Sequence, residues 1–246
     1  MGIVQFFEQN SHGFCEKIEG KISYTKPILG QFCWAPILHL KEIPQTLEAE
    51  REVSREHENI KFKVRNINNN DFQGKNKLPV KLLDLRQNQE LLIHSASKRP
   101  CIVLHYGATI FEDISSQLPS MGKKHLQQEK IMTVLPLFGI QDDVAHLGGF
   151  PPVMVARIRA MMYDQFFYFP KANSPLVYDS IGRLDHMQMI INNYNVCKFE
   201  PYKLTDECLA IIYSMVRRWF NLEIDEDFEA IVDLCRDACP EEYIPC

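Results

Sequence analysis

The chain has 246 residues, of which 46% are hydrophobic and 24% are charged, a composition that indicates a folded core and excludes a disordered or fibrous chain. It has no apolar run long enough to span a bilayer, and its first residues lack the basic region and long apolar segment of a secretory signal. The eight cysteines are scattered without a C-x-x-C pair, which favours reduced thiols over a disulfide framework or a zinc site. We therefore expect a cytoplasmic protein without a membrane segment, a bound metal or a cofactor.

The net charge of −5 is unevenly distributed along the chain. Residues 221–246 carry nine acidic residues and one arginine, a net of −8 that, set against the total, leaves the remainder at +3. A mildly basic body permits nucleic-acid binding without requiring it. The acidic C-terminal tail has two interpretations: it is a solvated helix, or it covers the basic face in place of RNA.

The N-terminal part of the chain predicts one core strand followed by a long excursion. Residues 1–29 have a mixed character and predict a short leader of strands or loop packed on the domain. Residues 30–37 predict a turn glycine and a strand. The stretch from 40 to 97 contains a charged cluster with weak helical periodicity and then an asparagine-rich, turn-rich patch, which is typical of an exposed loop insertion.

Residues 98–106 contain two basic residues and a proline that lead into β-branched and apolar residues. This pattern predicts a buried strand with Pro100 at its start, where a missing N–H is least harmful. The proline favours extended geometry at Arg99, which places that arginine at the mouth of the strand. There the guanidinium can meet a phosphate, or it belongs to an ordinary solvated strand edge.

Two further strands are predicted after a polar segment at 107–129, which itself predicts loop and a short helix. Residues 131–139 predict a buried strand that ends at Gly139. Residues 153–169 predict a long strand or bent strand pair with Arg157 and Arg159 on one face, because side chains alternate along a strand. That face is either solvated or able to bind phosphate.

Residues 179–186 place an arginine two positions before an aspartate. In a strand, Arg183 and Asp185 point the same way, so they either pair with each other or serve one bound group together. Residues 203–220 predict a helix with Thr205 as its N-cap and an apolar stripe at spacings of three and four. Residues 225–239 predict one more amphipathic, acidic helix.

Five short motifs follow one another in a definite order. They are the glycine-led strand at 30–37, Lys-Arg-Pro-Cys-Ile-Val-Leu at 98–104, Leu-Pro-Leu-Phe-Gly at 135–139, Asp-Ser-Ile-Gly-Arg-Leu-Asp-His at 179–186 and Leu-Thr-x-Glu-x-Leu at 204–209. This order resembles the MazF/PemK/Kid family of toxin endoribonucleases, over roughly residues 30–37 and 98–220. The resemblance implies a mostly β fold with α-helices, a small SH3-like barrel of MazF/PemK/CcdB type. The implied organisation is one domain at 1–220 with a loop insertion at about 40–97, followed by the acidic tail at 221–246.

The same resemblance implies a growth-inhibiting toxin that cuts single-stranded RNA without a metal, as a homodimer with an antitoxin protein as its partner. In that chemistry the 2′-hydroxyl attacks the neighbouring phosphate and leaves a cyclic phosphate and a 5′-hydroxyl. A base must take the 2′-OH proton, an acid must protonate the leaving oxygen, and a cation must stabilise the charge on phosphorus. By motif match, the candidate catalytic residues are Arg99, Arg183 and Asp185. The candidate substrate-binding residues are Lys98, His105, Arg157, Arg159 and His186.

Two departures from the family pattern favour a competing hypothesis. Phe138 stands about where other members have threonine or serine, and the first loop is far longer than in typical members. His39 is either the counterpart of the loop histidine that some members carry or a lone surface histidine. The alternative function is therefore a catalytically inactive barrel that binds RNA or a protein partner. A structural subunit without a nucleic-acid role is a third interpretation.

Overall fold

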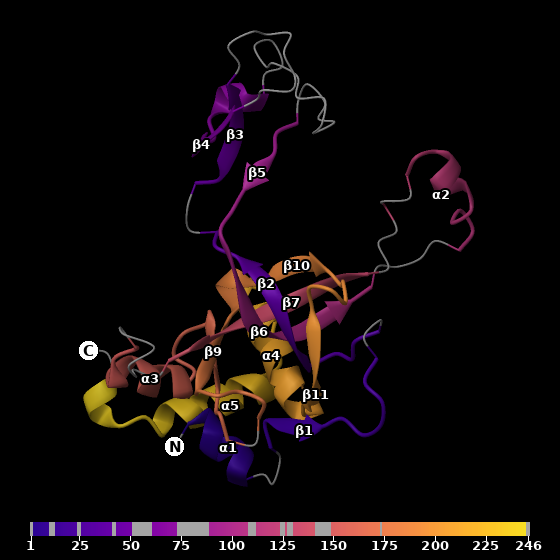
Figure 1. The fold of residues 1–246 in the computed structure, drawn as a ribbon. Helices are drawn as coiled ribbons and strands as arrows, with labels where there is room; N and C mark the ends of the chain where they lie inside the picture. The colour runs from indigo at the N-terminus through magenta and orange to yellow at the C-terminus, as the bar shows by residue number, and fades with distance from the viewer. Residues whose placement is uncertain are drawn as a thin grey trace. The chain divides into compact units, whose positions relative to one another are not determined.

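The computed structural model divides the chain into two compact units (Figure 1), which we call the body, Met1–Pro36 with Lys98–Cys246, and the insert, Ile37–Ser97. The residues that the structure describes are 2–9, 13–23, 26–40, 43–50, 61–72, 89–107, 112–123, 126, 130–140, 149–172 and 174–244.

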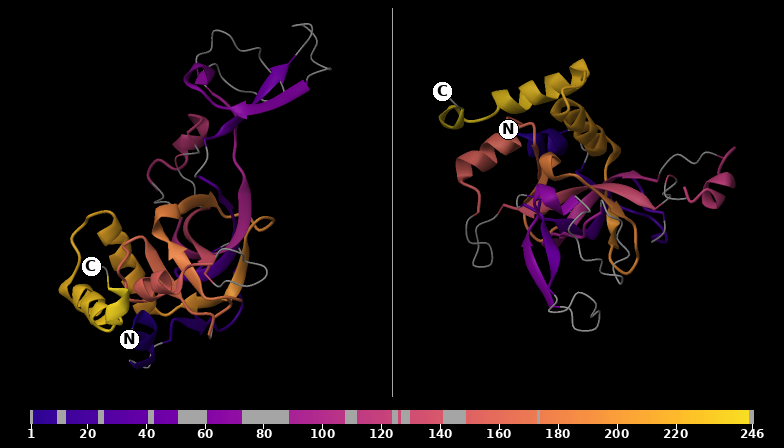
Figure 2. Two further views of the ribbon diagram at one scale, coloured as in Figure 1. Left: turned by 90° about the vertical axis from the view of Figure 1, so that its left-hand side faces the viewer. Right: turned by 90° about the horizontal axis from the view of Figure 1, so that it is seen from above.

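The body is built on one antiparallel sheet. Its strands lie in the order β1 (Cys15–Lys17), β11 (Lys198–Leu204), β2 (Gln31–Leu38), β6 (Ala96–Tyr106), β7 (Ile131–Gly139), β9 (Ser180–Arg183) and β8 (Phe166–Phe169), and β10 (Gln188–Ile191) also pairs with β7. The left view of Figure 2 shows this sheet curling round into part of a barrel. The fold is therefore mostly antiparallel β with few helices, as the sequence predicts.

The central strands form where the sequence is most continuously apolar. Residues Cys101–Leu104 of β6 and all four residues of β8 are buried, which explains why these runs show no polar alternation. Gly30 precedes β2 with a φ of +78°, a left-handed conformation that glycine adopts without steric cost. The predicted strands at 30–37, 98–106 and 131–139 are confirmed as β2, β6 and β7.

Four helices of the body bury one side against this sheet. They are α1 (Ile3–Gln9), α3 (Pro152–Arg159), α4 (Asp206–Trp219) and α5 (Glu226–Asp237), and each contributes buried apolar residues to the core that the strands share. The predicted short helix in the segment 107–129 is α2 (Gln117–Ser120). No helix in the described part of the chain is long and apolar enough to cross a membrane.

The two C-terminal helices begin at side-chain caps. Thr205 accepts a hydrogen bond from the Cys208 N–H at 3.4 Å, and Asp225 accepts one from the Phe228 N–H at 2.7 Å, which satisfies backbone donors that a helix start leaves unpaired. Both predicted helices are confirmed. The acidic tail contains helix α5, which buries Phe228, Val232 and Cys235 in the core and exposes its acidic face to solvent.

Three local predictions for the body are wrong. Residues 152–159 form helix α3, and only Phe166–Phe169 of the predicted strand at 153–169 is extended. A proline in the first turn has the φ that a helix needs, and alanine, methionine and arginine favour helix, so local propensity outweighs the alternating pattern. The leader at 1–29 contains helix α1. Strand β9 ends at Arg183, and Leu184–His186 form a 3₁₀ turn that carries Asp185.

The insert has a small sheet of its own. Its strands lie in the order β4 (Lys61–Asn66), β3 (Gln45–Glu50) and β5 (Leu92–Ile93), and a 3₁₀ turn spans Asn69–Phe72. The helical periodicity predicted for 41–59 is wrong over β3, where glutamates oppose lysines across the ladder, a pairing that stabilises adjacent strands. Arg65 of β4 binds both oxygens of Asp71. Residues 51–60 and 73–88, which include much of the predicted loop, lie outside the described residues.

Candidate functional site around Phe138

The aromatic ring of Phe138 lies where three neighbouring strands of the body meet. Phe138 is on β7, which pairs with β6 on one side and with β9 on the other. Cys101 faces Pro136 across β6 and β7, so continuing that antiparallel register by two residues places Arg99 opposite Phe138. Phe138 itself faces Ile181 of β9, two residues before Arg183. Strand pairing thus brings side chains distant in sequence to one face of the sheet.

Arg99 lies over the Phe138 ring, with its guanidinium carbon 4.4 Å from the ring centroid. This is cation–π geometry, in which the negative face of the ring attracts the cation. The Arg99 Nε atom is shielded from solvent and, among the described residues, has no hydrogen-bond acceptor. Burial lowers the pKa of the Arg99 guanidinium from its ordinary value. A partly buried cation that has no carboxylate partner in the described part of the chain is suited to an anion that arrives from outside.

Arg183 and Asp185 form an ion pair beside the same ring. Arg183 Nε donates to Asp185 Oδ1 at 3.1 Å, and Arg183 Nη2 donates to Asp185 Oδ2. The Arg183 guanidinium carbon is 5.5 Å from the Phe138 centroid. Arg183 and Asp185 therefore pair with each other in the ligand-free protein. Their side chains keep 30% and 24% of their surface exposed, which leaves the pair within reach of a ligand.

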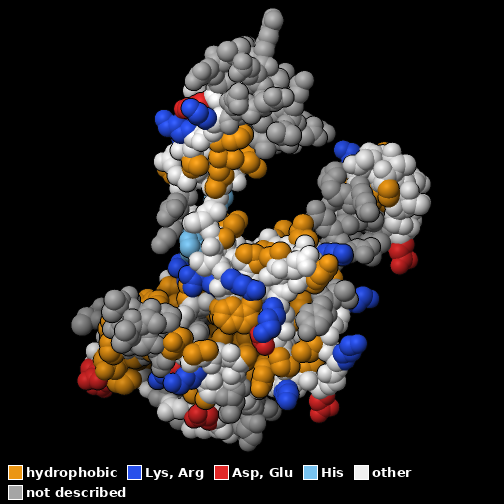
Figure 3. Space-filling view, in the orientation of Figure 1, with side chains coloured by type: hydrophobic (Ala, Val, Ile, Leu, Met, Phe, Trp, Pro, Cys, Tyr) orange, Lys and Arg blue, Asp and Glu red, His pale blue; other side chains and the backbone are white. Residues whose placement is uncertain are grey.

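His186 completes the group, which we call the Phe138 cluster: Arg99, Phe138, Arg183, Asp185 and His186. The His186 ring lies edge-on to Phe138 with 5.8 Å between centroids, and its Nε2 is 3.7 Å from Asp185 Oδ2. Figure 3 shows Lys and Arg side chains bordering a hydrophobic surface on one face of the body.

The Phe138 cluster therefore gathers two guanidiniums, one carboxylate and one imidazole on a single aromatic ring. Guanidiniums bind phosphate oxygens in bidentate fashion, and imidazole is the side chain that most readily exchanges a proton near neutral pH. The cluster joins all three candidate catalytic residues and one of the candidate substrate-binding residues.

Lys98 and His105 lie on β6 but outside the Phe138 cluster. Lys98 immediately precedes Arg99, so its side chain points to the opposite face of the strand, and its charge acts on Cys197. His105 lies toward the other end of β6, where its Nε2 is 2.7 Å from the Gly107 carbonyl oxygen. Neither residue contacts Phe138.

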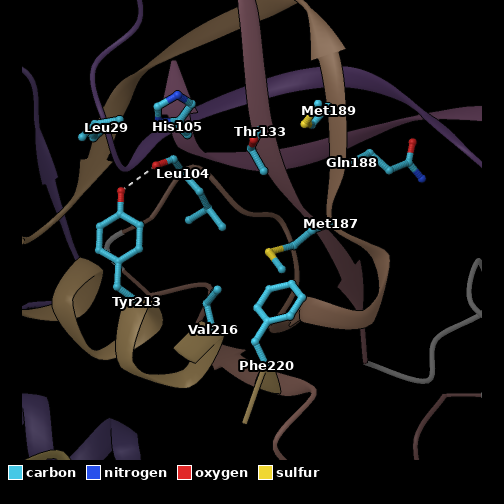
Figure 4. A pocket seen from close by; sticks show the side chains of 10 residues that line it. All are labelled: Leu29, Leu104, His105, Thr133, Met187, Gln188, Met189, Tyr213, Val216 and Phe220. Atoms are coloured by element: carbon cyan, nitrogen blue, oxygen red, sulfur yellow. Dashed lines mark hydrogen bonds between the residues drawn. The ribbon is translucent and has the colours of Figure 1, made fainter. Parts of the chain in front are cut away.

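His105 instead borders an apolar pocket of about 520 Å³ between the sheet and helix α4. Figure 4 shows Tyr213, Val216 and Phe220 on the helix side of this pocket, facing Thr133 and Met187. The Tyr213 hydroxyl donates to the Leu104 carbonyl at 2.5 Å. The exposed lining of the pocket is predominantly apolar, and the His105 ring and the Tyr213 hydroxyl have protein partners, so we assign no chemistry to it.

Arg157 and Arg159 lie on α3 and bind protein groups. Arg157 Nε donates to the Tyr243 carbonyl at 2.6 Å. Arg159 Nη2 donates to the Tyr168 hydroxyl at 2.5 Å and lies 3.7 Å from Asp179 Oδ2. Both arginines therefore hold the fold together and do not join the Phe138 cluster.

Sequence reasoning missed the central position of Phe138, which it noted only as a departure from the family pattern. The signal that could have revealed it was the strand register, because Arg99 and Phe138 belong to motifs on adjacent strands, and the pairing of Cys101 with Pro136 sets the two residues opposite each other. His39 lies in the insert, where its ring nitrogens are within 3.0 Å of the hydroxyls of Ser95 and Ser97.

Within the described ranges, no group of three or more His, Cys, Asp or Glu side chains is arranged to hold a metal ion. Every described cysteine is a free thiol. Comparison with known proteins finds no matching family model, no matching curated protein and no matching solved structure.

Proposed function

We propose that this protein is a MazF/PemK-like growth-inhibiting toxin, a metal-independent endoribonuclease with an SH3-like barrel that cleaves single-stranded RNA through a 2′,3′-cyclic phosphate. The observation that carries the proposal is the Phe138 cluster, in which Arg99, Arg183, Asp185 and His186 meet on one ring. The homodimer and the antitoxin partner that the family resemblance implies belong to the same proposal.

The cationic groups of the cluster suit the negative charge that develops on phosphorus. Arg99 has no carboxylate partner among the described residues, so a phosphate oxygen would give its guanidinium the acceptor it lacks. When the 2′-oxygen attacks phosphorus, the extra charge on the non-bridging oxygens is stabilised by preorganised donors. Arg99 is therefore assigned to phosphate stabilisation, with Arg183 as the second cation.

Proton transfer is assigned to Asp185 and His186. The attacking 2′-hydroxyl loses its proton to a base as the P–O bond forms, and the leaving 5′-oxygen takes a proton from an acid as its bond to phosphorus breaks. His186 beside Asp185 can donate a proton in its charged form and accept one in its neutral form. Arg183 is a poor proton donor because its pKa is far above neutrality, which favours His186 over Arg183 as the acid.

The second candidate is a catalytically inactive barrel that binds RNA. One observation favours it: both carboxylate oxygens of Asp185 accept hydrogen bonds from Arg183, so the carboxylate is occupied in the ligand-free protein. Phe138 and Arg99 would then grip the RNA backbone without performing chemistry.

The deciding experiment incubates the purified protein with single-stranded RNAs of varied sequence in EDTA, and analyses product ends for cyclic phosphate. We expect cleavage by the wild type and its loss in Arg99→Ala and Asp185→Asn. The matched control is Lys171→Ala, which removes an exposed cation outside the cluster. Salt-sensitive RNA binding without product would favour the inactive barrel. If the protein neither binds nor cleaves RNA at low salt, both candidates are rejected.

A further inference from the structure

A second recess in the body lies between α1, α4 and α5, helices that Figures 1 and 2 show at one end of the body. Its volume is about 330 Å³. The floor consists of Phe7, Ile211 and Phe228, which are buried, and the walls include the partly exposed Phe6 and Ile231. An apolar side chain of a partner would lose water contact on entering this recess, which favours binding.

The mouth of this recess is acidic. Glu207, Asp225 and Asp227 line it, all three are exposed, and no lysine, arginine or histidine is among the lining residues that the structure describes. Glu207 lies in the first turn of α4, and Asp225 and Asp227 lie at the start of α5. The surrounding segment 221–246 carries a net charge of −8, so the field at this end of the body repels RNA and attracts cations.

We propose that this recess binds a basic amphipathic segment of a partner protein. An apolar side chain of that segment fills the recess, and neighbouring lysines or arginines pair with Glu207, Asp225 and Asp227. The charge at the mouth selects this occupant over a nucleic acid, and the apolar floor selects it over a purely basic chain. No residue of the recess belongs to the Phe138 cluster, so the inference is independent of the ribonuclease proposal.

The test measures fluorescence anisotropy of three labelled synthetic peptides with the full-length protein. The probes are an amphipathic Leu/Lys helix, a Ser/Lys peptide of equal charge and a Leu/Glu helix of equal hydrophobicity. We expect the Leu/Lys peptide to bind at least about tenfold more tightly than either of the others. Only this peptide has both apolar side chains for the floor of the recess and lysines for its acidic mouth.

Two variants separate the recess from general surface charge. Ala210→Trp, at an exposed lining position of α4, should block the recess and weaken Leu/Lys binding about tenfold. Glu207→Gln combined with Asp227→Asn should weaken it similarly. The matched control is Asp233→Asn combined with Asp237→Asn, which removes the same charge from exposed positions of α5 outside the recess, and it should bind as the wild type does.

Three results would overturn the inference. The first is that the double variant at Glu207 and Asp227 and the control double variant weaken Leu/Lys peptide binding equally, which would indicate attraction to the net charge alone. The second is equal affinity for the Ser/Lys and Leu/Lys peptides. The third is unchanged binding in Ala210→Trp when circular dichroism and thermal unfolding match those of the wild type.

Discussion

The two arginines of α3 and Arg99 of β6 differ in what their donors contact. Arg157 and Arg159 of α3 donate to a backbone carbonyl and to a buried tyrosine hydroxyl, whereas Arg99 rests on Phe138 with no acceptor among the described residues. All three look alike in the sequence, as basic residues beside apolar ones. The difference teaches that the two α3 arginines support the fold, whereas Arg99, which has no acceptor in the described part of the chain, is available to a ligand.

The largest expected effect is on RNA cleavage by Arg99→Ala. Removing a preorganised cation from the developing charge should lower the cleavage rate about 100-fold or more, because the remaining cation at Phe138, Arg183, is already paired with Asp185. Single-turnover kinetics with a cleavable RNA measure this. Thermal unfolding should change little, since none of the residues that the structure describes provides a hydrogen-bond acceptor for Arg99. A large loss of stability with unchanged cleavage would mean that Arg99 supports the fold in the same way as the α3 arginines.

Arg159→Ala should show the opposite behaviour. The substitution removes the donor that meets the buried Tyr168 hydroxyl and a neighbour of Asp179, which should cost about 1–2 kcal/mol of unfolding free energy. Urea denaturation measures the cost, and RNA cleavage measured well below the melting temperature should stay at the wild-type rate. Cleavage that fell as far as in Arg99→Ala would assign Arg159 to the site.

The loss of stability at high pH provides a second test of the contact between Arg159 of α3 and Tyr168. Burial, the largest cause, raises the pKa of Tyr168 from 10.0 to about 12. Because the folded pKa exceeds the unfolded one, this stability is present below pH 10 and is lost as the pH rises from there through about 12. Across that pH window, the unfolding free energy of Tyr168→Phe should fall by about 2 kcal/mol less than that of the wild type. Chemical denaturation at each pH measures both values. Parallel profiles for the two proteins would contradict the assignment.

The smallest expected effect is that of Lys98→Ala. Lys98 neighbours Arg99 in sequence, but its side chain is exposed and lies on the other face of β6. We expect a change in RNA affinity of about 0.5 kcal/mol or less, visible mainly as a shallower salt dependence. A loss comparable to that of Arg99→Ala would mean that both faces of β6 contact the RNA.

The sequence supported the core of the fold because its strongest signals were local and uninterrupted. Strands β6 and β7 each contain a continuous apolar run. Helix α4 follows the Thr205 cap and has an apolar stripe with helical spacing only. Motif order also predicted that Arg99, Arg183 and Asp185 would meet. Their meeting is seen in the structure; their catalytic role stays a prediction.

The parts that sequence reasoning missed depend on competition or on distant pairing. In α3, alternate positions are apolar, yet the proline start and helix formers decide the outcome. In the insert, β3 and β5 pair across more than forty residues, a contact that no short window contains. Phe138 acquires its importance only when three strands lie side by side.

The strands that flank the insert also explain how the chain carries it. β2 and β6 are neighbours in the sheet, and the His39 N–H bonds the Ser95 carbonyl at 2.8 Å where the excursion begins and ends. The excursion is thus an enlarged hairpin loop, and each doubling of such a loop adds only about 0.6 kcal/mol of closure entropy. Replacing the insert with a segment of another length should therefore cost the body little stability, because β2 and β6 remain neighbours whatever segment joins them.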